Sequence, residues 1–213
     1  MTHGRLHALT DGIFAIVMTL MVLELKLPVI RGTTNRDLWN SLFAQKAIFV
    51  SYFVSFAVLF VYWRAHNFVI TILAKNININ LLTINGIFLF LVGLLPFSTQ
   101  LAGTYNTIPL ALSLYALNII AIGLTLLWMR TYIERSDFID NLTRTKAQRR
   151  AALIRTLLPV SFAALAIPFS FISTGLADVI LLIGVGYNFL NNAADLADKF
   201  LITPVNKILR TSI

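Results

Sequence analysis

The chain has 213 residues, of which 58% are hydrophobic and 12% are charged, and its formal net charge is +8. Soluble domains carry about a quarter charged residues, so this composition excludes a soluble globular fold and predicts an integral membrane protein. The absence of cysteine excludes disulfide scaffolds and thiolate metal sites. In a membrane protein a positive balance of this size is typical of basic cytoplasmic loops, and we expect no nucleic-acid partner.

Six hydrophobic segments are long enough to cross a bilayer as helices, which predicts an all-α fold with six transmembrane helices per chain. We expect one transmembrane domain over residues 1–193 and a short cytoplasmic tail over residues 194–213. No signal-peptide cleavage site follows the first segment, so we expect it to remain in the mature chain. The six segments lie near residues 9–27, 46–70, 81–102, 106–129, 153–172 and 175–193.

The first segment is apolar apart from Thr19 once the chain has passed Asp11 at its entrance. Because a helix advances about 100° per residue, Ile16, Leu20 and Leu23 lie along one stripe with Thr19 at its edge. Asp11 projects from roughly the opposite side. The stripe is a candidate pore lining, and lipid contact and bundle packing are the alternatives, because a helix that is apolar all round has a stripe in every direction.

Asp11 lies at the entrance of a membrane segment, where an ionisable side chain costs free energy unless it has a polar partner. Trp63 and His66 lie three residues apart near the end of the second segment, and antiparallel packing would bring them beside Asp11. We interpret these residues as a structural polar cluster that anchors the first helix. A cap at the helix N-terminus and a proton-transfer site are the alternatives.

Three features organise the rest of the chain. Pro96 is expected to kink the third segment, because proline lacks the N–H that continues a helix. The charged stretch over residues 130–150 is interpreted as a surface helix or loop. Trp39, in the first loop, is expected at a membrane interface.

The basic residues are distributed unequally between the two sides that the six segments define. Thirteen of the seventeen fall at the N-terminus, in the second and fourth loops and in the tail. The other four, Lys26, Arg31, Arg36 and Lys46, lie in or beside the first loop. The positive-inside rule therefore predicts that both termini are cytoplasmic.

Motifs for metal binding, a carbonyl filter or catalysis are either incomplete in this sequence or lie in the wrong structural context. His3 and His7 are four residues apart but have no third ligand nearby, so we expect no fixed metal site. The run from Gly184 to Tyr187 resembles a TVGYG filter strip, but it lies inside an uninterrupted apolar segment and is interpreted as helix packing. We see no nucleophile elbow, phosphate-binding loop or catalytic pair of carboxylates, so we expect neither an enzyme nor a cofactor.

The entrance of the first segment resembles the R-x-x-x-F-S-D signature that opens the first helix of the endolysosomal potassium channel family (transmembrane protein 175), in its prokaryotic six-helix form. Arg5 and Asp11 match the signature. Leu9 stands where Phe is usual, and Thr10 stands where Ser is usual. The motif is therefore present with two conservative departures.

The likeness extends over essentially the whole chain. The second segment carries Trp63-x-x-His66, and the third ends in Leu-Pro-Phe-Ser-Thr over residues 95–99. Asn67 stands where a second His is common, which is a further departure. The number of spans and the chain length also fit this family.

The resemblance implies a homotetramer around one pore lined by four copies of the first helix, and potassium-selective conduction without a carbonyl filter. In the family's pattern the hydrophobic constriction falls on Ile16 and a hydroxyl layer related to selectivity falls on Thr19. Further aliphatic rings fall on Leu20 and Leu23. Permeating potassium ions would pass near Thr19.

The resemblance also implies a set of polar contacts that hold the first helix, made by Arg5, Thr10, Asp11, Trp63 and His66. The implied partners are copies of the chain itself and membrane lipids, in the cell membrane of a prokaryote. Two alternatives are open: a proton-coupled secondary transporter that uses Asp11 and His66 as a relay, and a membrane scaffold that does not conduct.

Overall fold

The computed structural model describes residues 3–30, 32–73, 77–136 and 146–187, and the regular elements in these ranges are helices. This confirms the all-α fold. Two helices end in tighter or wider turns, the 3₁₀ turn η1 (Met21–Glu24) after α1 and the π turn η2 (Val69–Leu73) after α3. The α-helices are α1 (His3–Leu20), α2 (Asn35–Ala44), α3 (Lys46–Phe68), α4 (Ile79–Gly93), α5 (Leu95–Thr104), α6 (Pro109–Arg135), α7 (Lys146–Ser170) and α8 (Thr174–Gly186).

Helices cover each of the six hydrophobic segments. Four stretches are long and apolar enough to cross a membrane, and two shorter apolar helices follow them. The four stretches are Gly4–Leu23, Lys46–Thr71, Ile79–Thr104 and Pro109–Arg135, and the shorter ones are Thr156–Ser170 and Thr174–Gly186. The expected tail and the end of the sixth segment lie outside the described residues.

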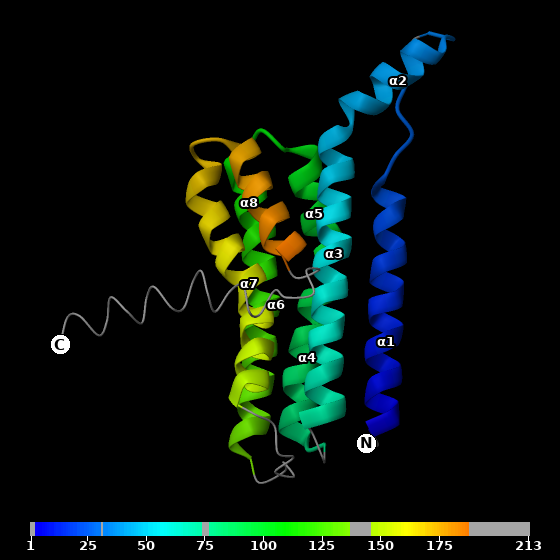
Figure 1. Ribbon diagram of the computed structural model, residues 1–213. Coiled ribbons are helices and arrows are strands. Elements are labelled where there is room, and N and C mark those ends of the chain that lie inside the picture. The colour runs from blue at the N-terminus through cyan, green and yellow to red at the C-terminus, as the bar shows by residue number, and fades with distance from the viewer. Residues whose placement is uncertain (1–2, 31, 74–76, 137–145, 188–213) are drawn as a thin grey trace, which may run out of the picture.

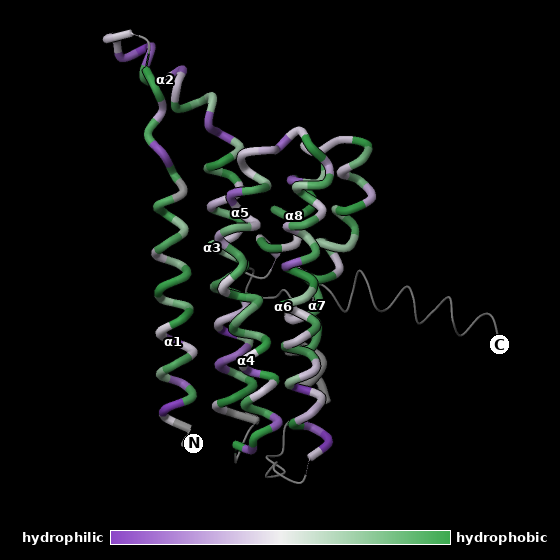
Figure 2. Tube along the Cα trace, turned by 180° about the vertical axis from the view of Figure 1, so that it is seen from behind, coloured by the Kyte–Doolittle hydropathy of each residue, from purple (hydrophilic) through white to green (hydrophobic). Residues whose placement is uncertain are grey.

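The helices form an elongated bundle in which α1 occupies one edge (Figure 1). Helix α1 contacts mainly α3 and α4, whereas α6, α7 and α8 pack closely on the far side of the bundle. Helix α2 rises beyond the ends of the other helices (Figure 1). Figure 2 shows hydrophobic residues along most of α1 and hydrophilic residues at its N-terminal end and around α2.

One face of α1 supplies the contact with the bundle. Leu6, Phe14, Val17 and Met21 are buried on this face. The ring of Phe14 packs against Phe88 of α4, with 6.0 Å between the ring centroids. With buried Thr10 between Leu6 and Phe14, the spacing is three or four residues throughout, which is that of one helical face. Burial of this face determines which side of α1 is left exposed.

Where a kink is expected at Pro96, the single residue Leu94 separates α4 from α5, and the backbone N–H of Ser98 still donates to the carbonyl oxygen of Leu94 at 3.1 Å. Pro96 occupies the first turn of α5, where its missing N–H costs no helical hydrogen bond. The carbonyl oxygen of Leu95 accepts hydrogen bonds from the hydroxyls of Ser98 (3.0 Å) and Thr99 (2.8 Å). Both are bonds from a side chain to the backbone of the preceding turn, made inside α5.

The hydroxyl of Thr99 also takes part in a chain of contacts that links three helices. The hydroxyl oxygens of Thr99 on α5 and Ser55 on α3 lie 2.7 Å apart. Ser55 in turn lies 2.7 Å from the hydroxyl of Tyr115 on α6. All three side chains are buried, so the apolar interior of the bundle contains a chain of hydrogen-bonded hydroxyl groups.

The charged stretch expected as a surface helix or loop is partly the ends of two long helices. Helix α6 continues to Arg135 and α7 begins at Lys146, so both helices extend past the apolar segments. Arg130 and Glu134 form an ion pair at 3.0 Å along α6. Charged residues end a hydropathy window but do not end a helix.

The first loop contains a short capped helix. Thr34 and Asp37 form a capping box at the start of α2, with the Thr34 hydroxyl donating to the Asp37 carboxylate at 2.6 Å. This hydrogen bond, together with one from the Thr34 backbone N–H, holds the pKa of Asp37 below its ordinary value. Trp39 is exposed on the same helix.

Candidate pore-lining helix and its polar anchor

The stripe predicted on the first helix is exposed on the surface of the single chain. Ile16 is 57% exposed, Leu20 is 47% exposed and Leu23 is 69% exposed. They lie on the flank of α1 that its contacts with α3 and α4 leave uncovered. A surface this apolar is stable only against lipid or against another protein copy.

Thr19 lies at the edge of this stripe and is also exposed. Its hydroxyl donates to the backbone oxygens of Ala15 (2.8 Å) and Ile16 (2.9 Å) in the preceding turn. Because the hydrogen of Thr19 points into the helix, its oxygen presents lone pairs outward. The side chain is therefore available as an acceptor.

A hydrogen bond joins the two helices at the anchor. The indole N–H of Trp63 donates to Oδ1 of Asp11 at 2.9 Å, as the sequence led us to expect. The carboxylate oxygen accepts from a donor-only side chain, which fixes the direction of the bond. This contact fastens the entrance of α1 to α3.

His66 contacts a different residue from the expected Asp11. Its Nε2 is 2.7 Å from Oδ1 of Asn85, and its ring stacks on Phe88 with 5.0 Å between centroids. His66 is buried between α3 and α4 and its hydrogen bond is directed to α4, whereas Trp63 reaches α1. Asn85 is thus a partner that the sequence analysis did not assign, although a polar residue inside an apolar span signals one.

A second polar chain lies further along the same end of the bundle. Thr71 donates to Oδ1 of Asn67 at 2.7 Å, and its hydroxyl lies 3.4 Å from Nε2 of His7. Asn67, which departs from the family pattern, is therefore hydrogen-bonded within η2 and α3. His7 and Asp11 both face α3, so α1 meets it through polar groups on successive turns.

The remaining anchor residues differ in their surroundings. Arg5 is exposed on the first turns of α1. Thr10 is buried, and within the described part of the chain its hydroxyl oxygen has no hydrogen-bond partner. The side chains of His3 and Glu24 lie outside what the structure describes.

The glycine run near the end of the chain is helical. Gly184 and Gly186 belong to α8, and Tyr187 follows its last turn. A methyl group at Gly184 would overlap the side chain of Phe162, so the glycine allows α7 and α8 to pack closely. A carbonyl filter needs an extended strand, which this segment does not have.

Comparisons with known proteins place this geometry in a family. The family described as endosomal/lysosomal potassium channel TMEM175 matches residues 5–96, which include the motif, α3 and α4. A potassium channel of Chamaesiphon minutus is 32% identical over 151 residues, which cover 68% of this chain and 71% of that channel. The chain belongs to the TMEM175 potassium channel family.

Two further comparisons agree with TMEM175 membership. A potassium channel of Chryseobacterium sp. is 36% identical over 129 residues, which cover 60% of this chain and 64% of that channel. The crystal structure of a lysosomal potassium-selective channel TMEM175 homolog from Chamaesiphon minutus superposes with a TM-score of 0.72 at 25% identity. That match covers 87% of this chain and 95% of the other, so the two chains share one fold over most of their length.

Proposed function

We propose that four copies of this chain form a potassium-selective channel whose pore is lined by α1. The observation that carries the proposal is the exposed stripe of Ile16, Leu20 and Leu23 on a helix at the edge of the bundle. In a fourfold assembly around that edge, the stripes of four copies face one axis and are removed from lipid. Membership of a potassium channel family supports this use of the surface.

The narrowest ring of this pore is made by Ile16. Four branched apolar side chains leave no group that replaces the hydration of an ion, so a narrow ring stays dry and closes the pore. A tilt or rotation of α1 widens the ring and lets ions pass. Potassium holds its water less strongly than sodium, so a ring of this kind favours potassium.

Thr19 supplies the acceptors beside the constriction. Its hydroxyl hydrogen is engaged by the backbone of the preceding turn, so four outward oxygens offer lone pairs to a partly dehydrated cation. Potassium is the permeating ion, and it passes Thr19 without a fixed metal site. Among the described residues no cluster of three metal-binding side chains is present.

The orientation of the chain in the membrane follows from the distribution of its basic residues. Six spans place both termini in the cytoplasm of a prokaryotic cell, because thirteen of the seventeen basic residues then lie on that side. The hydrogen bond from Trp63 to Asp11 holds α1 while its apolar stripe faces the axis, and we assign Arg5, Thr10 and His66 to the same structural polar cluster. A proton relay from Asp11 to His66 is not favoured, because the hydrogen bond of His66 goes to Asn85.

The chain has no cysteine, so single cysteines test the pore directly. Ile16→Cys and Leu20→Cys should react with a charged thiol reagent applied in water and block the potassium current of reconstituted protein. Val22→Cys is the matched control, since Val22 is also exposed but lies about 120° from Leu23 around the 3₁₀ turn η1. It should face lipid and stay unmodified.

Single-channel steps in the unmodified protein would separate a channel from a transporter or a scaffold, and the mass of the solubilised complex would give the number of copies. Equal block of the Ile16 and Val22 variants would contradict the assigned pore face. An absence of current steps from an intact tetramer would contradict the channel itself.

A further inference from the structure

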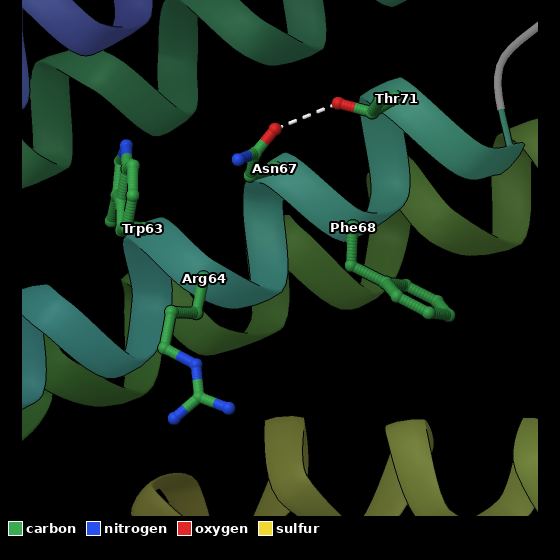
Figure 3. A pocket seen from close by; sticks show the side chains of 5 residues that line it. All are labelled: Trp63, Arg64, Asn67, Phe68 and Thr71. Atoms are coloured by element: carbon green, nitrogen blue, oxygen red, sulfur yellow. Dashed lines mark hydrogen bonds between the residues drawn. The ribbon is translucent and has the colours of Figure 1, made fainter.

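The proposed pore uses α1 and leaves two surface features of the chain unexplained. One is a surface pocket on α3 and η2, lined by Trp63, Arg64, Asn67, Phe68 and Thr71. Arg64 and Asn67 point to opposite sides of α3 (Figure 3), so their polar groups do not converge on one ligand. The other feature is the segment between α1 and α3, which exposes apolar side chains outside the membrane-spanning stretches.

This segment lies on the aqueous side of the bundle's end. It follows the apolar stretch Gly4–Leu23 and precedes the stretch Lys46–Thr71. The Lys46 ammonium group lies 5.0 Å from the centroid of the Phe43 ring, where α2 passes into α3. A lysine at the end of a span extends toward water, so its position marks the boundary of the hydrocarbon layer. Helix α2 therefore begins where the membrane ends.

Helix α2 is amphipathic, and its apolar side is open in the single chain. Leu38, Trp39, Leu42 and Phe43 have the i, i+1, i+4 and i+5 spacing that gathers side chains on one side of a helix. Trp39 is 68% exposed, and none of the ten residues of α2 is buried. Asn40 is exposed about 100° away from Trp39, among the polar side chains of the helix. An apolar side this open in water marks a contact surface.

The irregular segment that leads to α2 carries a second open apolar patch. Leu27 is 92% exposed and Val29 is 89% exposed. Pro28 stands between them and disfavours a helical backbone at Leu27. Side chains two residues apart in an extended chain point to the same side, so Leu27 and Val29 form one patch. Because both patches are exposed, neither covers the other within one chain.

The direction of α2 favours a second copy of the chain, rather than lipid, as the cover for these patches. An amphipathic helix bound to a membrane lies in the plane of the headgroups. Helix α2 instead rises away from the end of the bundle and leans toward the edge that α1 occupies (Figure 1 and Figure 2). In the proposed channel that edge is where copies meet, and Leu27 follows the exposed stripe that ends at Leu23.

We propose that the apolar side of α2 packs on Leu27 and Val29 of the neighbouring copy, four times around the outer mouth of the pore. Each contact joins two different patches, so it repeats about a fourfold axis and closes into a ring. Trp39 is the anchor of the contact, because a large aromatic side chain contributes most where it becomes buried. This places Trp39 against protein, whereas the sequence alone led us to expect it at the membrane interface.

The ring would tie the outer end of each α1 to the next copy, because Leu27 lies only a few residues beyond η1. The inference rests on the proposed function, which supplies the axis and the number of copies. It adds a contact that lies outside the membrane and away from Ile16, so the two can be tested separately.

Disulfide formation between two single-cysteine chains tests the contact, since the natural chain has no cysteine. Trp39→Cys and Val29→Cys carry different tags, are expressed together, and are oxidised as the full-length complex in lipid nanodiscs. A disulfide-linked heterodimer should form, and the two tags show that it joins separate chains. Asn40→Cys replaces Trp39→Cys in the matched control and should stay unlinked, because Asn40 lies on the polar side of α2.

A second variant measures how much the contact contributes to assembly. Trp39→Gln should raise the concentration at which the purified complex dissociates about tenfold, whereas Asn40→Gln should leave it unchanged. Dissociation of the two variants at the same concentration would overturn the proposal.

Three further results would also overturn it. Equal linkage of the Trp39→Cys and Asn40→Cys pairs, or no linkage of either in an intact complex, would exclude the assigned contact. Linkage only between two Trp39→Cys chains would indicate that α2 meets α2. Quenching of a fluorophore on Trp39→Cys by brominated phospholipid would assign the apolar side to lipid. Any of these results in a complex that still gives current steps would leave the proposed function standing.

Discussion

Replacing Gly123 by alanine should destabilise the bundle where α6 meets α3 and α7. A Cβ atom at this position would overlap Cγ2 of Val160 and lie 2.7 Å from the hydroxyl of Tyr62. Tyr62 is fully buried and donates to the backbone oxygen of Ile119 at 2.9 Å, so the methyl group must displace both a stiff valine and a hydrogen-bonded phenol.

The expected cost follows from these contacts. Overpacking costs about 1–3 kcal/mol and the loss of a buried hydrogen bond about 1–3 kcal/mol, whereas the helix propensity of alanine over glycine returns about 1 kcal/mol. The net loss is about 3 kcal/mol in the free energy of unfolding, which corresponds to a fall of about 6–12 °C in Tm.

Tryptophan fluorescence during heating of the detergent-solubilised protein measures this change. Gly86→Ala is the matched control, because no atom lies within 4 Å of a Cβ added at that helical glycine. The control should keep its Tm or raise it slightly, since only the propensity gain applies there. A Tm for Gly123→Ala equal to that of Gly86→Ala would refute the packing argument.

Four other outcomes are expected. Ile16→Asn should wet the constriction and raise the leak current of reconstituted protein, and an unchanged flux would count against a gate at this position. Thr19→Ala should bring the reversal potentials for potassium and sodium together while conduction persists, and unaltered potentials would refute the acceptor role. A double-mutant cycle of Trp63→Phe and Asp11→Ala should give a coupling of about 1 kcal/mol in thermal unfolding, because the bond is charge-assisted but its carboxylate is exposed; strict additivity would contradict it. Because its pKa is lowered in the fold, Asp37 should cap α2 at and above the ordinary aspartate pKa and lose this effect as the pH falls through the lowered value. Amide hydrogen exchange in α2, corrected for intrinsic rates, should accelerate as the pH falls through that value. The Asp37→Asn variant should not show this pH-dependent step. Exchange in the unmodified protein that does not change with pH would exclude the effect.

Much of the helical architecture could be predicted from the sequence because lipid imposes one strong rule. A backbone in hydrocarbon must satisfy its own hydrogen bonds, so long apolar runs become helices. Pro96 marked the break in the third segment for the same reason, since its nitrogen has no hydrogen to donate. The ends of the helices were harder to predict from the sequence. Helix α6 continues through its charged residues to Arg135, because polar side chains are stable on a helix that extends beyond the membrane.

The anchor was predicted in part. Trp63 and Asp11 meet as expected, because the antiparallel helices α1 and α3 bring a donor and an acceptor to the same level. His66 is three residues further along α3 and was placed on the same face, but it is rotated by about 60° from Trp63, and that rotation is enough to reach α4. A helical wheel gives the angle between two side chains but not which neighbour stands at each angle, so Asn85 could not be assigned.

The position of α1 at the edge of the bundle has a consequence for biogenesis. This helix is synthesised before α3 and α4, its neighbours within the bundle. Until they arrive, Leu6, Phe14, Val17 and Met21 have only lipid to contact, and Asp11 has no Trp63. In the proposed channel the stripe beginning at Ile16 is covered later still, when finished chains meet. Among the helices of this bundle, α1 is therefore the earliest to be made and the last to be fully covered.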